Sequence, residues 1–458
     1  MSTRFIVVGA DAAGMSAASE ARRVDPDLEI VAYDRGGYAS YSQCGLPYLV
    51  GGVVAEHHQL TARTVTEFAA RGITVHLGHE VTAVDPARHT LRARDPHGAE
   101  TEQAYDTLLF ATGASPARPL IPGLDQTGVF HLDVMEDGLA MRAYIQKYQP
   151  RRAVIIGGGY IGLEMAENLR RLGLAVALVQ RGPQLFPSVD VDISVPITEE
   201  LGRHGVDVSW CDSVVEACEG GHGRVAEVHT NKGAVRADLV LLATGVKPTV
   251  ELASAAGIAL GATGAIAVDD HQRTSAPGIF AAGDCAEHWH RLLGRPTWMP
   301  LGTTANKQGR IAGRNAAGGA EAFAGIVGTA IARVFDLEVG RTGLTEREAM
   351  AAGIACVATT LASTDHAGYL PDARPLTVKL VAERDSGRLL GGQAVGRGGV
   401  AKRVDVVATA LHAGLSVEDL TRLDLAYAPP FNSVWDPIQV AATVLLRAGL
   451  GDRTKGLA

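Results

Sequence analysis

The sequence predicts an α/β protein of several domains, in which two similar β-α-β units precede a C-terminal part of mixed strands and helices. A chain of 458 residues exceeds what one hydrophobic core usually serves. Residues 4–23 and 151–173 each contain an apolar strand, a glycine turn and a small-residue helix. After residue 319 this order is replaced by mixed strands and helices. That part includes a predicted hairpin over 374–396 and a helical stripe over 400–411.

Composition and charge exclude several classes of protein. Hydrophobic residues make up 47% and charged residues 20% of the chain, which is typical of a globular protein. A formal net charge of -8 without a block of lysine or arginine argues against nucleic acid or an anionic membrane as partner. Five irregularly spaced cysteines predict no disulfide framework, and no segment is typical of a signal peptide or a membrane span. We therefore expect a cytoplasmic protein, and we expect no bound metal.

The second glycine turn has the pattern of a dinucleotide fingerprint. Gly157, Gly159 and Gly162 follow a strand and open a helix. In this context the glycines allow a tight turn, close approach of a pyrophosphate and packing of the helix on the sheet. The first turn keeps Gly9 and Gly14 but has Asp11 in place of the middle glycine, so by itself it is a weaker signal.

Asp34 strengthens the interpretation of the first turn. It ends the next strand, 20 positions after Gly14, where a ribose-binding carboxylate is expected. The alternative is an aspartate that merely ends a strand. Related strand-plus-turn phrases occur at 108–119, 239–248 and 278–287. In the last of these, Gly283 and Asp284 follow an apolar strand, which suits a carboxylate that binds a ribityl hydroxyl; a simple strand-end turn is the alternative.

Taken in this order, the motifs resemble those of the flavoprotein pyridine nucleotide-disulfide oxidoreductases, over essentially the whole chain. The resemblance implies a homodimer with two Rossmann-like dinucleotide-binding domains, arranged as in glutathione reductase, plus a C-terminal α+β dimerisation domain. The FAD-binding domain would comprise residues 1–115 and 248–324, the NAD(P)H-binding domain 116–247 and the dimerisation domain 325–458. The implied cofactor-binding residues are Gly9, Ala12, Gly14, Asp34, Ala111, Thr112, Gly113, Gly157, Gly159, Tyr160, Gly162, Gln180, Arg181, Gly245, Gly283, Asp284 and Thr304.

The segment SYSQCGLPY, residues 40–48, contains the candidate redox thiol, Cys44. Two-cysteine members of the family have a partner thiol five positions earlier, where this chain has Ala39, and a C-terminal His-Glu pair, whereas no histidine follows His412 here. The segment therefore resembles the single-cysteine subgroup, which comprises coenzyme A-disulfide reductases with NADH oxidases and peroxidases as relatives. The alternative is a small core cysteine that precedes a turn.

The chemistry requires the thiolate form of Cys44, because the thiolate attacks disulfide sulfur. Pro47 suits the first turn of a short helix ended by Gly51 and Gly52. The helix dipole contributes about 0.3–1 kcal/mol, less than the roughly 1.4 kcal/mol of one pKa unit. The flavin and a donor such as Ser40 or a tyrosine would have to supply the rest.

Other positions bear on the electron acceptor. Oxidases and peroxidases commonly have an active-site histidine where this chain has Ala12, so oxygen or peroxide would lack its usual proton donor. Two segments around Tyr369 and Tyr427 resemble those of coenzyme A-disulfide reductases, in which these tyrosines reach the partner's cysteine across the dimer; each could instead be an interface residue. The candidate substrate-binding residues are Gln43, Arg22, Arg23 and Arg71. The arginines could equally be solvated, and Glu20 would repel the phosphates of coenzyme A.

The end of the second β-α-β unit bears on which nicotinamide nucleotide is the donor. Gln180 lies 18 positions after Gly162, where NADH-using domains usually have an acid, and Arg181 follows it. This favours NADPH, with NADH possible. The sequence thus predicts an FAD-dependent NAD(P)H oxidoreductase that reduces a small disulfide or persulfide. Coenzyme A disulfide is the favoured substrate, and coenzyme A could be held as a mixed disulfide on Cys44. The alternatives are an NADH oxidase or peroxidase and a slow-turnover redox-sensing flavoprotein.

Overall fold

The structure is a computed structural model that describes residues 3–448. The chain divides into two compact units, each assembled from separate stretches of sequence. Unit 1 comprises Met1–Leu120, Phe130–Gln149 and Thr244–Ile326. Unit 2 comprises Ile121–Val129, Pro150–Ala243 and Val327–Ala458. The predicted boundaries between the nucleotide-binding and dimerisation domains stay predictions.

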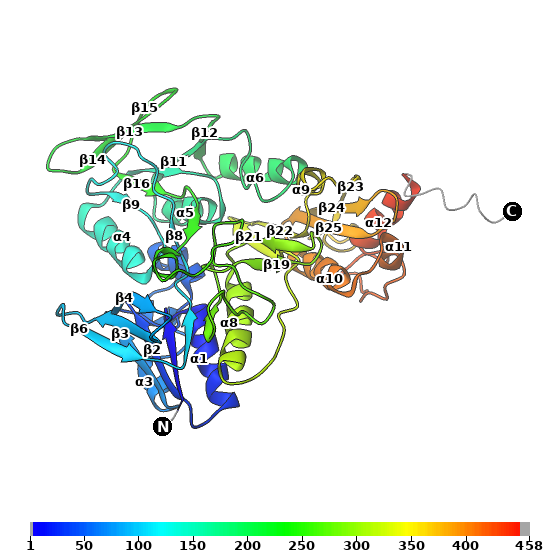
Figure 1. The fold of residues 1–458 in the computed structure, drawn as a ribbon. Coiled ribbons are helices and arrows are strands. Elements are labelled where there is room, and N and C mark those ends of the chain that lie inside the picture. Colours follow the sequence, from blue (N-terminus) through cyan, green and yellow to red (C-terminus); the bar gives the residue numbers. More distant parts are fainter. Residues whose placement is uncertain (1–2, 449–458) are drawn as a thin grey trace. The chain divides into compact units, whose positions relative to one another are not determined.

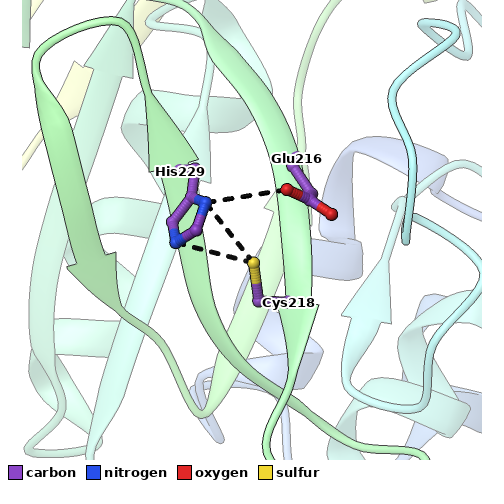
Figure 2. Close-up of side chains that lie close together, drawn as sticks. All are labelled: Glu216, Cys218 and His229. Atoms are coloured by element: carbon purple, nitrogen blue, oxygen red, sulfur yellow. Dashed lines mark hydrogen bonds and ion pairs between the residues drawn. The ribbon is translucent and has the colours of Figure 1, made fainter.

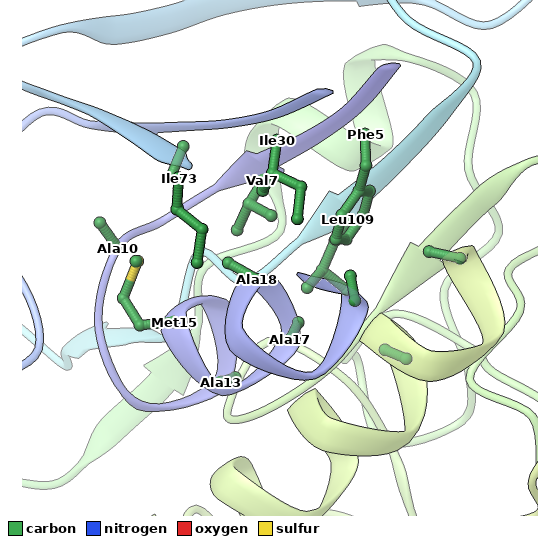
Figure 3. Packing of buried hydrophobic residues seen from close by; sticks show 14 of the residues in the cluster. Phe5, Val7, Ala10, Ala13, Met15, Ala17, Ala18, Ile30, Ile73 and Leu109 are labelled. Carbon is green, nitrogen blue, oxygen red and sulfur yellow. The ribbon is translucent and has the colours of Figure 1, made fainter. Parts of the chain in front are cut away.

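A five-stranded parallel sheet forms the centre of unit 1 (Figure 1). Its strand order is β18-β7-β1-β2-β3, with β1 Arg4–Val8, β2 Glu29–Asp34, β3 Ile73–Leu77, β7 Thr107–Phe110 and β18 Ile279–Ala281. Strands β1 and β7 are almost wholly apolar because helices cover the sheet, as in other α/β proteins. Figure 3 shows Phe5 of β1, Ile30 of β2 and Leu109 of β7 packed against the small side chains of the first helix.

Two helices of unit 1 approach each other closely, α1 Ala12–Val24 and α8 Gly302–Ala316. A Cβ atom added to Gly309 would lie 2.2 Å from the carbonyl oxygen of Ala13. One added to Gly313 would lie 2.1 Å from the carbonyl oxygen of Ala17. Only glycine therefore fits at these two places, and the contact holds the first half of α1 against the second half of α8.

Smaller elements complete unit 1 around this sheet. They are η1 Gln43–Gly45, α2 Leu46–Val50, η2 His57–Leu60, α3 Val65–Ala69, β4 Glu80–Asp85, β5 Thr90–Arg94, β6 Glu100–Ala104, β8 Ala114–Pro116, α4 Met135–Tyr148, β17 Val246–Pro248, α7 Glu251–Ala255, β19 His288–His290 and β20 Arg295–Thr297. Strands β4, β5 and β6 form an antiparallel sheet. Strand β8 precedes the second nucleotide-binding fold in the sequence and strand β17 follows it, and the two strands pair with each other.

A second nucleotide-binding fold occurs in unit 2. Its sheet has the order β12-β11-β10-β16-β9, formed by β9 Val129–Phe130, β10 Arg152–Ile156, β11 Ala175–Gln180, β12 Val206–Trp210 and β16 Leu239–Leu242. The helices are α5 Tyr160–Arg171 and α6 Val191–Arg203. An antiparallel sheet of β13 Val214–Glu219, β14 Val225–Thr230 and β15 Gly233–Arg236 packs its apolar side on the same core.

The C-terminal part of unit 2 is an antiparallel sheet covered by helices. The strand order is β21-β22-β25-β24-β23, formed by β21 Ala330–Val334, β22 Leu337–Gly343, β23 Cys356–Thr364, β24 Pro375–Glu383 and β25 Leu389–Gly396. The helices are α9 Glu346–Ala351, α10 Val400–Ala413, α11 Val417–Leu420 and α12 Pro437–Arg447. The predicted hairpin is β24–β25, and the predicted helical stripe is the buried face of α10, so both are confirmed.

Over residues 3–448 no helix combines the length and the apolar composition that a bilayer span requires.

Candidate active site

The first glycine turn joins β1 to α1 and is closed by backbone contacts. Gly9 has φ +107°, and a Cβ atom there would lie 2.1 Å from the carbonyl oxygen of Ala111. A Cβ atom on Gly14 would lie 1.8 Å from the carbonyl oxygen of Gly9. Both positions therefore require glycine, and α1 begins immediately at Ala12. The unpaired amides in the first turn of such a helix are a binding site for a pyrophosphate.

Asp34 is held against this turn by two backbone amides. Its Oδ2 accepts a hydrogen bond from the amide of Ala10 at 2.7 Å, and its Oδ1 accepts one from the amide of Gly36 at 2.7 Å. Burial raises the pKa of this carboxyl group. The side chain is therefore fixed at the end of β2, where the ribose of a bound dinucleotide would lie.

Asp11, which the sequence showed only as a missing glycine, is a second carboxyl group in the same turn. It is the N-cap residue of α1, and its Oδ1 accepts a hydrogen bond from the amide of Tyr41 at 3.0 Å. Burial, followed by the charges of Asp34 and Asp284, raises its pKa to about 6, although the hydrogen bond from Tyr41 opposes this shift. Its position inside the turn was the only signal in the sequence.

Asp284 lies at the turn after β18, next to α8. Gly283 has φ +81°, and its amide donates to Gln308 Oε1 at 3.0 Å. Burial raises the pKa of Asp284 to about 6. Its Oδ1 atom is buried and has no hydrogen-bond partner among the described residues. An unpaired buried acceptor is costly, so this position fits a ligand hydroxyl, as the ribityl chain of FAD would supply.

Asp133 is a further carboxyl group, which the sequence did not reveal. Its pKa is raised to about 6, first by burial and then by the charge of Asp137, with a smaller contribution from Asp284. Gln43 donates its Nε2 to the carbonyl oxygen of Asp133 at 2.5 Å and to the Oδ1 of the same residue at 3.2 Å. These two bonds connect the cysteine segment to the residues that immediately precede α4, Met135–Tyr148.

The cysteine segment begins at a strained residue. Ser40 has φ +49°; its amide donates to the carbonyl oxygen of Ala10 at 2.9 Å, and its carbonyl oxygen accepts from Ala62 at 2.7 Å. These bonds hold a conformation that few non-glycine residues adopt, directly beside the first glycine turn. The predicted cofactor site and the cysteine segment are therefore joined by backbone bonds.

Cys44 itself lies in η1 and is exposed. The short helix α2 follows, with Pro47 in its first turn and Gly51 as its C-cap, which confirms the predicted helix. No disulfide bond joins any of the five cysteines, all of which lie within residues 3–448. The exposure of Cys44 excludes the alternative of a buried core side chain.

Four predicted residues lie where the chain crosses between the two nucleotide-binding folds. Thr112 Oγ1 donates to the carbonyl oxygen of Thr249 at 2.6 Å. Gly113 and Gly245 have φ +69° and +96°, and their carbonyl oxygens accept from Thr249 and Ala117. Ala111 adjoins Gly9. These contacts join the crossing strands β8 and β17.

Thr304 lies in another predicted position, the first turn of α8, where it is buried. A direct role in binding FAD stays a prediction.

The second glycine turn has the same backbone and different side chains. Gly157 has φ +107°, and a Cβ atom on Gly162 would lie 2.0 Å from its carbonyl oxygen. Gly159 faces open space within 4 Å. Gln180 Oε1 accepts from the amide of Gly158 at 2.9 Å, while its Nε2 donates to the carbonyl oxygen of Gln184 at 2.8 Å. Arg181 is exposed directly after β11.

Two further side chains lie on the first turns of α5. Tyr160 packs edge-on against Phe186, with 4.5 Å between ring centroids, and burial raises the pKa of its hydroxyl. Glu164 follows one helical turn later, and burial, followed by the charge of Glu167, raises its pKa to about 7. Sequence reasoning missed Glu164, although its spacing of four from Tyr160 was visible.

Two of the three arginines predicted to bind the substrate, Arg22 and Arg23, have side-chain partners within the chain. The guanidinium of Arg22 donates to the carbonyl oxygens of Leu28 and Gly72, each at 2.6 Å, and to that of Pro26. This supports a structural role at the end of α1. Arg71 is exposed nearby, and its role in substrate binding stays a prediction.

The carboxylate of Glu20, which we expected to repel the phosphates of coenzyme A, has cationic partners in the structure. Glu20 is buried, and Arg23 lies 2.5 Å from it. Arg314 lies 3.2 Å and Arg310 3.8 Å from the same carboxylate. Glu321 also pairs with Arg310 and Arg314. Because three arginines surround Glu20, this patch does not exclude an anionic substrate.

The two predicted tyrosine segments meet in the C-terminal part of unit 2. The guanidinium of the buried Arg403 donates to the carbonyl oxygen of Asp365 at 2.7 Å and to Asn432 Oδ1 at 2.9 Å. Tyr369 is 74% and Tyr427 48% exposed. Arg403 thus joins the segments and leaves both phenol groups accessible, a connection that was invisible in the sequence.

Two dinucleotide-binding folds in one chain, with an exposed cysteine beside the first, define a flavin- and nicotinamide-dependent redox protein. The family model of the pyridine nucleotide-disulphide oxidoreductases matches residues 3–309, and that of the dimerisation domain of this family matches residues 329–437. The chain belongs to this family. It is therefore an oxidoreductase and a flavoprotein, and it carries the family's dimerisation domain, as the sequence predicted.

Similar proteins are known among both sequences and structures. The NAD(P)H coenzyme A polysulfide/persulfide reductase of Pyrococcus horikoshii is 39% identical over 97% of this chain and 99% of its own. A coenzyme A disulfide reductase of Staphylococcus epidermidis is 30% identical over 95% and 98%. The structure of reduced CoADR-RHD from Bacillus anthracis has a TM-score of 0.94 at 37% identity, covering 98% of this chain and 80% of that one.

Proposed function

We propose that this protein is an FAD-dependent NAD(P)H reductase of a small disulfide or persulfide, with coenzyme A disulfide as its leading substrate and Cys44 as its redox thiol. The observation that carries the proposal is the exposed Cys44, in a segment bonded through Ser40 and Gln43 to the first glycine turn and to Asp133. The names of the similar proteins, which act on coenzyme A disulfide or on persulfide, support it.

The first glycine turn, Asp34 and Asp284 would hold FAD, since they provide a pyrophosphate site, a ribose acceptor and an unpaired buried carboxylate oxygen. When bound, FAD supplies the route by which two electrons pass from NAD(P)H to sulfur. The chain's own contribution is to place the Cys44 segment beside this site and to exchange sulfur bonds.

The thiolate of Cys44 attacks one sulfur of the substrate disulfide, so that one S–S bond breaks and a mixed disulfide with Cys44 forms. The departing sulfur takes a proton. Two electrons then reduce the mixed disulfide, which restores the Cys44 thiolate and releases the second thiol. In balance, one disulfide, one NAD(P)H and one proton give two thiols and NAD(P)⁺. With a persulfide, the products are one thiol and hydrosulfide.

A tyrosine hydroxyl would supply the proton to the departing sulfur. In this proposal Tyr427 or Tyr369, contributed across a homodimer, is that acid. Support comes from the exposure of both phenol groups and from Arg403, which holds their segments together.

NADPH is the proposed donor, with NADH as the alternative. Gln180 is an uncharged amide where a carboxylate would repel a 2'-phosphate, and Arg181 next to it is exposed and cationic. The second candidate function is an NADH oxidase, because the relative from Methanocaldococcus jannaschii, 34% identical over 97% of this chain, carries that name.

Replacing the thiol tests the proposal. Cys44→Ser should leave flavin reduction by NADPH intact in rapid-mixing measurements, while steady-state reduction of coenzyme A disulfide is abolished. Cys211→Ser, which changes another exposed cysteine, is the matched control and should keep the full rate. Oxygen, assayed in parallel, should be a poor acceptor. An unchanged disulfide rate in Cys44→Ser would refute the thiol mechanism, and rapid reduction of oxygen to water would assign the chain to the oxidases.

A further inference from the structure

A group of metal-ligating side chains lies on the hairpin β13–β14, outside the active site. The register pairs Glu216 with His229 and Cys218 with Glu227. Neighbours directly opposite each other, and residues two apart along a strand, share one face of a sheet. The intervening Ala217 belongs to the buried core on the other face. Four potential ligands therefore lie together on the outer face of the nucleotide-binding domain.

The distances within this group match those of a metal site. Figure 2 shows the Sγ atom of Cys218 and the carboxylate of Glu216 on one strand, both facing the imidazole of His229 on the next. Cys218 Sγ lies 3.7 Å from each ring nitrogen of His229, and Nδ1 lies 3.6 Å from Glu216 Oε2. Ligands at roughly 2.0–2.3 Å from a tetrahedral Zn²⁺ ion are themselves about 3.3–3.6 Å apart.

Glu227 occupies the position of an outer partner. Its Oε1 lies 2.8 Å from His229 Nε2. A histidine that binds a metal through one nitrogen commonly donates its other N–H to a carboxylate, which fixes the ring and its tautomer. This contact leaves Nδ1 to face Glu216 and Cys218.

We propose that Cys218 Sγ, His229 Nδ1 and the Glu216 carboxylate bind one Zn²⁺ ion, with Glu227 orienting the imidazole and water in the fourth position. The ion would join β13 to β14 at a place where register shifts interrupt the ladder on both sides. The sequence predicted no metal because Cys218 and His229 are 11 positions apart, and only the register of the hairpin brings them together.

The charges of the group favour a divalent cation. Glu216 and Glu227 bring two carboxylates to the imidazole of His229, at 3.6 and 2.8 Å. Binding would replace the S–H proton by a Zn–S bond and release one proton, with no change of oxidation state.

In two other groups of possible ligands, arginines already pair with carboxylates. Glu200 pairs with Arg203 at 2.7 Å and also with Arg397, which in turn lies 3.6 Å from Asp336. In the group formed by residues 269–271, Arg273 binds Asp269 at 2.7 Å. Glu200, Asp336 and Asp269 therefore each have an arginine partner, and Asp270 pairs with His271, whereas Glu216 and Glu227 both pair with His229.

Titration of the flavin-loaded protein with Co²⁺, a spectroscopic substitute for Zn²⁺, tests the site. The Cys44→Ser background removes the redox thiol as a competing ligand. In this background we expect one Co²⁺ per chain and a thiolate-to-cobalt charge-transfer band. Adding Cys218→Ser should abolish the band, whereas adding Cys211→Ser should leave it unchanged. Glu227→Gln should weaken Zn²⁺ binding about 10-fold or more, as loss of an outer partner does.

A second measurement needs no variant of the site itself. Zn²⁺ should slow the alkylation of Cys218 in the wild-type chain, followed by peptide mass spectrometry, and should leave that of Cys211 unchanged. Absence of a thiolate band in the parent protein, or a band that persists in Cys218→Ser, would overturn the proposal. Equal alkylation of Cys218 with and without Zn²⁺ would do the same.

Discussion

In the first dinucleotide turn Gly9 has φ +107°, and in the second Gly157 has the same value. In both turns the last glycine lies so close to the carbonyl oxygen of the first that a Cβ atom would be within 2.0 Å of it. Ala10, which follows Gly9, and Gly158, which follows Gly157, each donate a backbone N–H hydrogen bond to the side chain that ends the next strand. The backbone of the turn is thus duplicated.

The side chains on these two backbones differ in charge. The first turn has Asp11 and Asp34, whereas the corresponding places in the second have Gly159 and Gln180. An amide accepts the bond from the turn as the carboxylate does, but it carries no charge toward a nucleotide. The comparison shows that closure of the turn depends on glycine contacts. It also predicts that the choice of nucleotide depends on the residues that replace each other between the turns.

The largest expected effect is that of a glycine substitution that prevents closure of the first dinucleotide turn. Gly14→Ala would force a Cβ atom into the carbonyl oxygen of Gly9, so we expect a loss of about 3 kcal/mol or more in the free energy of unfolding, together with loss of FAD. Gly159→Ala, whose Cβ atom would meet open space, should unfold close to the wild-type temperature. Thermal unfolding and the flavin content of both variants measure this. Equal destabilisation would refute the distinction.

Much of the fold follows from local patterns that a single sequence displays. Apolar strands with glycine turns predict both nucleotide-binding units, and the spacing of Val400, Val404, Val407 and Leu411 predicts the buried face of α10. These patterns are visible because each lies within one or two consecutive elements.

The parts of the candidate site that the sequence did not predict depend on contacts between segments that are distant in the sequence. The pKa of Asp133 is raised because folding buries this residue near Asp137 and Asp284. Arg403 joins two segments that lie on either side of it in the sequence. Likewise, no spacing rule shows that Glu20 is surrounded by Arg310 and Arg314. Such side chains look like ordinary surface charges until tertiary packing is known.

The second prediction concerns the choice of nicotinamide nucleotide. Arg181→Ala should reduce the preference for NADPH over NADH about 10-fold, equivalent to about 1.4 kcal/mol, because a cation next to the 2'-phosphate is lost. Gln180→Glu, which restores an acid like Asp34, should shift the preference toward NADH. Rates of flavin reduction with each donor give the ratio. Arg236→Ala, an exposed arginine on β15, is the control, and an identical ratio in Arg181→Ala would show that this strand end does not select the donor.

The smallest expected effect is the pH dependence that Asp11 adds to the first turn. Burial raises the pKa of Asp11 to about 6 from its ordinary value of 3.8, so the folded chain binds more protons than the unfolded chain between these values. Stability of the FAD-free protein should therefore be greatest below pH 4 with respect to this group, and should fall as the pH rises to about 6.

The slope would be at most about 1.4 kcal/mol per pH unit for one group, and smaller in practice because Asp284 and Asp133 titrate in the same range. Asp11→Asn keeps an oxygen that can accept from the amide of Tyr41 and removes the charge, so its stability should fall less steeply between pH 4 and pH 6. Denaturant unfolding across this range measures the slope. Asp27→Asn, which changes an exposed carboxylate, should leave the slope unchanged. If Asp11→Asn also left it unchanged, the carboxyl group would carry no energetic cost in the turn, and the difference between Asp11 and Gly159 would have no consequence for stability.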